Sequence, residues 1–377
     1  MDLHIECGRA LVAEVHGAAE CSVVAVPGNV RYLDEELSLS AITAVTTSRI
    51  ARKQGLASRL TARAVAEDAA DGAQVAGLGI FEQGFYNQLG FGSGGYEHWA
   101  SFDPARIKVG VKARMPRRVT GNDWAAVHAA RLVRRRGHGA SNLIPPEVTQ
   151  ADMIFTKNGF GLGYWDDRSG ELTHHFWCRA KEPEHGPYTV NWLSFQTPDQ
   201  FLELMALIRS LGDQVRLVRM REPQGIQIQD MIKRPLKQRQ MSEKSKYERG
   251  IRATAYWQMR ICDLAGCLAK THLRSHTVRF NLALTDPIKR SLDEGAPWRG
   301  ITGDYVVTLG PSSGAEPGTD SALPTLSASV GAFSRLWLGV RPASGLAVTD
   351  RLYGPPELLE ELDWALRLPE PKPDWDY

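Results

Sequence analysis

The residue types best suited to chemistry stand in a short basic loop, Arg52-Lys53-Gln54-Gly55-Leu56-Ala57. Gly55 lets the backbone approach a ligand closely, and Arg52 and Lys53 add positive charge. A helix that begins at the end of this loop would direct its free amides and roughly half a positive charge to the same point. The sequence therefore predicts an anion site suited to a pyrophosphate, with a plain strand-to-helix turn as the alternative.

A tyrosine provides the second candidate. It stands in Phe85-Tyr86-Asn87-Gln88-Leu89-Gly90-Phe91, on a short helix predicted from Gln83 to Leu89. A phenol, with an ordinary pKa of about 10, can donate a proton to a departing thiolate of comparable basicity. Tyr86 is therefore a candidate general acid, and a packing residue on an amphipathic helix is the alternative.

Particular elements must position these residues. Apolar residues from Leu37 to Val45 recur at every second position, which predicts a half-buried strand before the loop. After the loop, Leu56, Leu60 and Ala64 follow helical spacing, and the helix should end near Asp71. Further strands are predicted at Arg9 to Val15, Cys21 to Leu33, Gln74 to Ile80 and Tyr96 to Phe102.

The middle of the chain repeats this order of elements roughly. Thr197 is a suitable cap and Pro198 a suitable first residue for a helix that runs to Leu211. The strands predicted here are Gly161 to Tyr164, Leu172 to Ala180, Tyr188 to Phe195, Gln214 to Arg221 and Gln227 to Ile232. A polar, basic stretch from Lys237 to Gly250 is predicted as a linker or surface helix.

The last part of the chain begins with an apolar run, Trp257 to Leu268, which predicts a helix. Strands are then predicted at Thr277 to Leu284, Asp304 to Leu309, Thr325 to Ser329 and Leu346 to Thr349. The chain closes with a proline-rich tail, Pro369 to Tyr377, which should be stiff and extended.

The bulk properties are those of an ordinary globular protein. Of 377 residues, 43% are hydrophobic and 23% charged, and the formal net charge of +2 is too small to predict nucleic-acid binding. The five cysteines are widely spaced and predict buried thiols, and the ten histidines show no zinc or triad spacing, so no metal is predicted. No apolar run is long enough to span a membrane, and no signal peptide is evident. We therefore expect a cytoplasmic protein.

The basic loop and the tyrosine motif together resemble the GNAT-type acetyltransferases. Arg52–Ala57 matches the family's R/Q-x-x-G-x-G/A signature, and Tyr86 with Gly90-Phe91 matches its second marker, in the same order. The layout of the rest is similar to the Eis-type members, which carry a sterol-carrier-protein-like domain at their C-terminus. The run Trp257–Leu264 and the segment Phe333–Gly339 resemble parts of that last domain.

The resemblance implies an α+β (mixed α/β) fold in three parts. Residues 1–114 would be a GNAT domain, residues 115–245 a second GNAT-like domain without the motif, and residues 246–377 a sterol-carrier-protein-like domain that ends in the catalytic C-terminus. It also implies acetyl-CoA as co-substrate, no metal, a homo-oligomer and a primary, polycationic amine as acceptor. The residues implied in cofactor binding are Val45, Thr47, Arg52, Lys53, Gln54, Gly55, Ala57 and Ser58.

The resemblance also assigns roles in a direct transfer from the thioester to the amine. Backbone groups around Val45 to Thr47 would hold the carbonyl, and Tyr86 would protonate the thiolate. The C-terminal carboxylate of Tyr377 would act as general base, and Asp376 would attract the cationic substrate.

Two features depart from the family pattern. Only about eight residues precede the first predicted strand, where a strand and two helices are expected, and Arg49 stands where proline is common. A non-catalytic protein that binds CoA, or a lipid through the sterol-carrier-like domain, is therefore the second hypothesis. It predicts that Tyr86→Phe changes nothing, whereas the enzyme should lose turnover.

Overall fold

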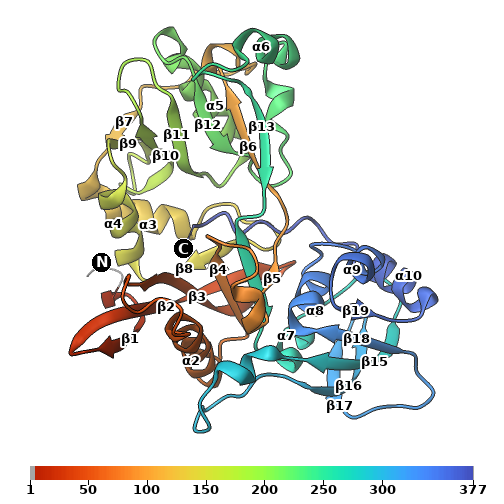
Figure 1. The fold of residues 1–377 in the computed structure, drawn as a ribbon. Helices are drawn as coiled ribbons and strands as arrows, with labels where there is room; N and C mark the ends of the chain where they lie inside the picture. The colour runs from red at the N-terminus through yellow and green to blue at the C-terminus, as the bar shows by residue number, and fades with distance from the viewer. Residues whose placement is uncertain (1–4, 377) are drawn as a thin grey trace. The chain divides into compact units, whose positions relative to one another are not determined.

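The computed structural model describes residues 5–376 and has a mixed α/β fold (Figure 1). The chain forms two compact units. The first unit contains residues 1–95, 137–145 and 255–377, and the second contains residues 96–136 and 146–254. Most of the predicted first and third domains thus lie together in the first unit, and most of the predicted second domain lies in the second.

One sheet of the first unit carries both motifs. Its order is β1-β2-β3-β4-β14-β5, with β8 beside β2. The strands are β1 (Arg9–Val15), β2 (Ala18–Tyr32), β3 (Glu35–Thr47), β4 (Val75–Gly79), β5 (Gly92–Ser93), β8 (Ser141–Leu143) and β14 (Trp257–Ile261). Helix α2 (Leu56–Ala70) connects β3 to β4, which run parallel. Its small residues Ala62 and Ala64 are fully buried in the core that the helix shares with this sheet.

Strand β14 corrects a prediction. The helix expected from Trp257 to Leu268 is a strand, β14, followed by α7 (Leu264–Ala269), which Asp263 caps through the amide of Gly266 at 2.9 Å. All five residues of β14 are buried, and the strand pairs with β4 on one side and with β5 on the other. The alternation of apolar and polar residues in β14 extends over only five positions, which is short for separating a strand from a helix.

The remaining residues of the first unit form a second sheet, in the order β17-β16-β15-β18-β19. Its strands are β15 (Val278–Thr285), β16 (Gly303–Leu309), β17 (Gly314–Pro317), β18 (Thr325–Ser329) and β19 (Leu352–Tyr353). The helices that accompany it are α8 (Val330–Trp337), α9 (Ala343–Thr349) and α10 (Pro356–Ala365), with the short 3₁₀ helix η6 (Pro287–Ser291). The strand predicted from Leu346 to Thr349 is wrong, because these residues continue the helix that starts after Pro342.

The second unit is built on a sheet in the order β13-β6-β12-β11-β10-β9-β7. The strands are β6 (Glu97–Phe102), β7 (Arg117–Val119), β9 (Gly159–Trp165), β10 (Leu172–Ala180), β11 (Tyr188–Ser194), β12 (Val218–Arg221) and β13 (Gly250–Thr254), and the helices are α3 (Trp124–Leu132), α4 (Pro146–Phe155), α5 (Pro198–Ser210) and α6 (Pro235–Ser242). The predicted cap is confirmed, since Thr197 Oγ1 accepts a hydrogen bond from the amide of Gln200 at 3.2 Å. The strand predicted from Gln227 to Ile232 is instead a short 3₁₀ helix, Ile228–Met231.

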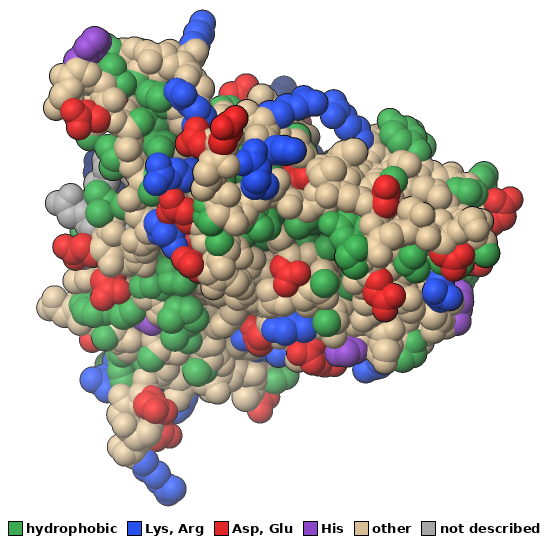
Figure 2. All heavy atoms as spheres, turned by 90° about the horizontal axis from the view of Figure 1, so that it is seen from below, with side chains coloured by type: hydrophobic (Ala, Val, Ile, Leu, Met, Phe, Trp, Pro, Cys, Tyr) green, Lys and Arg blue, Asp and Glu red, His purple; other side chains and the backbone are tan. Residues whose placement is uncertain are grey.

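The surface carries both signs of charge. Figure 2 shows Lys and Arg interspersed with Asp and Glu over one face, as the small net charge of the sequence leads one to expect. Within the part of the chain that the structure describes, no helix is both long and apolar enough to cross a membrane. Among the same residues, no group of His, Cys, Asp and Glu side chains could hold a metal ion.

Candidate active site

Strands β3 and β4 separate in the middle of the first sheet. Their parallel pairing ends at Ile42 and Leu78, although β3 continues to Thr47. Just beyond that point β3 bulges, because Ala44 and Val45 together face the single residue Val23 of β2, and Ala44 takes a φ of 50°. A bulge bends its strand and leaves backbone groups unpaired. The end of β3 therefore presents backbone amides and carbonyls on the side where β4 has diverged.

Two predicted cofactor residues lie on this diverging end. Val45 is partly buried and packs on the core cluster that also contains Tyr86. The hydroxyl oxygen of Thr47 lies 3.3 Å from the Sγ of Cys21 on β2. The neighbouring β2 strand thus supports the segment that leads into the basic loop.

Gly55 stands where the loop becomes α2. It occupies the cap position with a φ of 73°, and no side chain caps the helix. The amides of the first turn, which includes Ala57 and Ser58, are therefore not taken by a side-chain cap and are available to an anion. A Cβ on Gly55 would meet nothing within 4 Å, so the need for glycine here comes from its left-handed backbone.

The loop charges are exposed and available. Arg52 and Lys53 are exposed, and neither has a carboxylate partner among the described residues. Gln54 fastens the loop instead: its Nε2 donates to the carbonyl of Ile50 at 3.2 Å, and its own carbonyl accepts from Arg59 Nη2 at 3.3 Å. The sequence-predicted loop residues are thus brought together around one uncapped helix start.

Tyr86 begins the short 3₁₀ helix η1 (Tyr86–Leu89) and is 2% exposed. Its ring makes edge contacts with Phe81, Phe85 and Phe91 at centroid distances of 5.8, 4.8 and 6.2 Å. Burial raises the pKa of Tyr86 to about 12. The phenol therefore holds its proton at every pH near neutrality, so it is available as an acid.

The turn that carries Tyr86 is held by residues that the sequence reasoning missed. Gln258 and Arg260 of β14 hydrogen-bond to it, through Asn87 and the carbonyl of Leu89 respectively. Because Trp257 to Leu268 was predicted as a helix, nothing in the prediction brought these two side chains to the turn. The available signal was the alternation of Trp257, Met259 and Ile261 with these two polar residues, which is typical of a strand.

The C-terminal tail docks within the same unit. The amide of Lys372 donates to the carbonyl of His138 at 3.1 Å, and the amide of Ser141 donates to the carbonyl of Pro373 at 2.7 Å. Trp375 is 3% exposed, and Asp376 is exposed at the end of this tail. Tyr377, the predicted base, lies outside the described residues. The tail is therefore fixed beside β8, which pairs with β2 in the sheet that carries the bulge.

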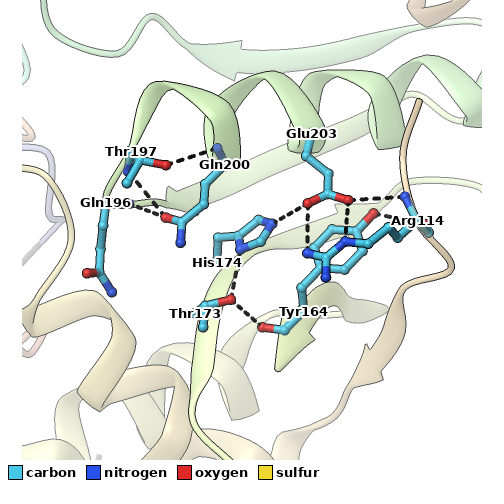
Figure 3. Close-up of polar contacts among 8 residues, drawn as sticks. All are labelled: Arg114, Tyr164, Thr173, His174, Gln196, Thr197, Gln200 and Glu203. Atoms are coloured by element: carbon cyan, nitrogen blue, oxygen red, sulfur yellow. Dashed lines mark hydrogen bonds and ion pairs between the residues drawn. The ribbon is translucent and has the colours of Figure 1, made fainter. Parts of the chain in front are cut away.

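In the second unit, Thr173, His174 and Glu203 form a hydroxyl–imidazole–carboxylate series like that of a catalytic triad (Figure 3). His174 lies 2.8 Å from Thr173 Oγ1 and 3.1 Å from Glu203, but Thr173 also donates to the carbonyl of Tyr164 at 2.9 Å. Glu203 accepts three bonds from Arg114, whose side chain holds the pKa of this carboxyl to about 2. The hydroxyl and the carboxylate are both engaged, so the cluster is a structural clamp between β10 and α5.

One match to a known protein family covers the segment that contains the basic loop and Tyr86. Residues 2–94 match the family model described as an acetyltransferase (GNAT) domain. The comparison with curated protein sequences gave no significant match.

Several solved structures share the fold of the whole chain. A GCN5-related N-acetyltransferase from Anabaena variabilis has a TM-score of 0.77 at 12% identity, covering 100% of this chain and 92% of that one. A conserved protein from Enterococcus faecalis, described as a probable N-acyltransferase, has a TM-score of 0.76 at 16% identity, covering 100% and 91%. Eis1 from Mycobacterium abscessus has a TM-score of 0.75 at 14% identity, covering 100% and 92%.

The stretch that matches the GNAT acetyltransferase domain thus contains the bulged strand, the basic loop and Tyr86, and the chain as a whole has a fold similar to that of N-acetyltransferases.

Proposed function

We propose that the chain moves an acetyl group from acetyl-CoA directly to a primary amine. The observation that carries the proposal is the continuous path from the bulge at Ala44 and Val45 to the uncapped helix start at Gly55. Acetyl-CoA has its thioester at one end and its pyrophosphate further along the molecule, so it needs a path that offers a site for each group. The match of residues 2–94 to the GNAT acetyltransferase domain supports the same assignment.

The cofactor would be held mainly by backbone groups. The first amides of α2 would bind the pyrophosphate, with Arg52 and Lys53 adding charge. The backbone of Val45 to Thr47 would lie along the rest of the cofactor and donate to the thioester carbonyl. Donors fixed in this way polarise the carbonyl and stabilise negative charge on its oxygen when the amine attacks.

Tyr86 would act as the general acid. As the amine nitrogen bonds to the carbonyl carbon, the carbon–sulfur bond breaks and the thiolate takes the phenolic proton. Tyr86 belongs to the core cluster against which Val45 packs, and this supports the proposal that the acid acts near the end of β3. A phenol with a raised pKa is a weaker acid than a free one, so its proton moves only as the sulfur becomes strongly basic.

The C-terminal tail would supply the general base and attract the acceptor amine. We infer that the carboxylate of Tyr377 accepts the proton of the amine or orients it, and that Asp376 attracts a polycationic acceptor such as a polyamine, an aminoglycoside or a lysine side chain. Trp375, buried at the end of a docked tail, supports this role because it leaves little chain between a fixed point and the terminal carboxylate.

The first experiment is a calorimetric titration of the full chain with acetyl-CoA, followed by thiol release with spermidine, kanamycin and a lysine peptide. We expect one-site binding in the micromolar range and release with at least one amine. Tyr86→Phe should lower kcat by about 100-fold or more while binding stays intact. Tyr305→Phe, which removes a half-buried phenol that bonds to Ile301 in the same unit, is the matched control and should leave kcat unchanged.

Binding without thiol release for any amine, and without an effect of Tyr86→Phe, would instead favour a protein that only binds CoA. No detectable heat from the folded chain would contradict the proposal.

A further inference from the structure

We infer that Gln258 and Arg260 of β14 are positioning residues that hold the turn carrying Tyr86 in place. Gln258 and Asn87 are 171 positions apart in the chain, so β14 reaches the turn from a distant part of the sequence. The inference rests on the proposed function, because it concerns the acid of that reaction. It makes this strand part of the catalytic machinery rather than a separate domain.

Asn87 is the first point of contact. Within the turn, its Oδ1 accepts from the amide of Gly84 at 3.0 Å and its Nδ2 donates to the carbonyl of Phe91 at 3.1 Å. The side chain therefore spans the turn from one end to the other. Gln258 contacts the Asn87 side chain from β14: its Nε2 donates to Asn87 Oδ1 at 3.0 Å and to Ser93 Oγ at 3.2 Å.

Arg260 is the second point of contact. Its Nη1 donates to the carbonyl of Leu89, the last residue of η1. Its Nη2 lies 2.5 Å from Asp286 Oδ2, and both side chains are fully buried. The turn fits closely here, since a Cβ on Gly90 would lie 2.5 Å from Val330 and 2.9 Å from Arg260 Nη1. Gln258 and Arg260 are two positions apart on a strand and so face the turn together.

The turn needs such support. A 3₁₀ helix of four residues has little stability of its own. The hydroxyl of Tyr86 has no hydrogen-bond partner among the described residues, so the ring direction depends on the aromatic contacts and on the backbone of the turn. Because proton donation requires a placement within roughly half an ångström, small movements of this backbone matter for the rate.

Buried polar atoms without a hydrogen-bond partner indicate that Gln258 and Arg260 do more than fill space. Gln258 Oε1 and Arg260 Nε are buried without a hydrogen-bond partner among the described residues. A buried polar atom left unpaired is costly, and an apolar residue would fill the same place without that cost. Gln258 Nε2 and Arg260 Nη1 donate to groups of the Tyr86 turn, and an apolar residue could not supply these donors.

The test is a cycle of Gln258→Leu and Tyr86→Phe in the full chain, assayed with acetyl-CoA and spermidine. Gln258→Leu removes the unpaired oxygen together with the donors, so the Tm should stay within about 3 °C of the wild type. We expect kcat to fall about 10-fold or more while KM for acetyl-CoA changes less than about 2-fold. In the Tyr86→Phe background the same change should have no further effect, because its only route to the reaction is through the phenol.

Asn281→Leu provides the matched control. Asn281 is a buried amide of the same unit whose bonds go to Asp320 and Leu323, far in sequence from the turn. It should lower the Tm and leave kcat unchanged. An equal loss of kcat in the Tyr86→Phe background, or no loss in the wild type, would overturn the inference.

Hydrogen exchange separates this inference from the proposed function. Amides of residues 84–93 should exchange faster in Gln258→Leu than in the wild type or in Asn281→Leu, whichever amine is the acceptor. Unchanged exchange would overturn the positioning role even if acetyl transfer is found. Faster exchange in a chain whose kcat ignores Tyr86→Phe would instead overturn the role of Tyr86.

Discussion

Tyr32 and Trp337 lie face to face in the first unit, with ring centroids 4.4 Å apart and an angle of 6° between the planes. The hydroxyl of Tyr32 also donates to the carbonyl of Trp337 at 2.9 Å, and both residues are buried. This pair joins the end of β2 to α8, residues that are 305 positions apart. The motif-bearing segment and the C-terminal segment are therefore packed together within one compact unit.

Tyr32→Phe should destabilise the first unit. The ring stacking is retained, but the carbonyl of Trp337 loses a buried donor, which costs about 1–2 kcal/mol. Urea unfolding followed by tryptophan fluorescence measures the difference. Tyr305→Phe removes a hydroxyl that bonds to Ile301 at a half-buried position, and its effect should be smaller. Equal effects of the two variants would mean that the buried link does not stabilise the unit beyond its stacking.

Arg52→Ala with Lys53→Ala should weaken acetyl-CoA binding. Both side chains are exposed and lack carboxylate partners among the described residues, so their charge is free for an anionic ligand. Removing both should raise Kd by about 10- to 100-fold, and the loss should shrink as salt is added. Calorimetry at low and high salt measures both effects. Arg274→Ala, at an exposed position of the same unit, should leave Kd unchanged.

The sequence predicted the site better where local rules decide the structure. The basic loop follows a strand and precedes a helix, as expected from the alternation up to Val45 and the spacing after Gly55. The bulge could not be predicted from the sequence. Ala44 takes a φ of 50°, a conformation that glycine usually indicates, and no glycine stands at this position. Strand β14 was missed for another reason: its partners β4 and β5 lie far away in the sequence, and the alternation of Gln258 and Arg260 with apolar residues covers only five positions before the apolar residues of α7 follow.

The rate should not fall at alkaline pH through loss of the acid. Burial raises the pKa of Tyr86 to about 12, so the phenol keeps its proton well beyond neutrality. Between about pH 7 and pH 10, kcat should rise as the acceptor amine loses its proton and then level off. Steady-state assays of wild type and Tyr86→Phe over this range measure the profile. The variant should be slower with the same rising limb, and a fall near pH 9 in the wild type alone would contradict the assignment.

Asp376→Asn should affect the acceptor more than the cofactor. The carboxylate is exposed at the end of the docked tail, and it lies outside the basic loop proposed to bind the cofactor. KM for spermidine should rise by about 2- to 5-fold at low salt, and the increase should be smaller at high salt. Asp363→Asn on α10 is the control for a lost negative charge. An equal change in KM for both variants would show that only the net charge matters.

His138 should make the first unit sensitive to acid. Its Nδ1 accepts from the amide of Leu33 at 3.1 Å, and its Nε2 lies 3.0 Å from the carbonyl of Leu338. The neutral ring satisfies both bonds, and burial lowers its pKa to about 4. At a pH above about 6.5 the ring is neutral in the folded and unfolded states, and its contribution to stability is complete. As the pH falls from there to about 4, only the unfolded chain takes up the proton, so the stability falls.

His138→Gln should therefore flatten the acid side of the stability profile. Over this window the wild type should lose up to about 3 kcal/mol more than a variant without the titrating ring. Calorimetric Tm values from about pH 4 to pH 7.5, at fixed ionic strength, measure the difference. Burial also lowers the pKa of His175 in the second unit, to about 3, so both histidines make the wild type less stable in acid. The difference between the wild type and His138→Gln therefore isolates the part that is due to His138. His276→Gln, at an exposed position, should keep the wild-type slope. Parallel profiles for His138→Gln and the wild type would mean that the ring of His138 is not buried in its neutral form.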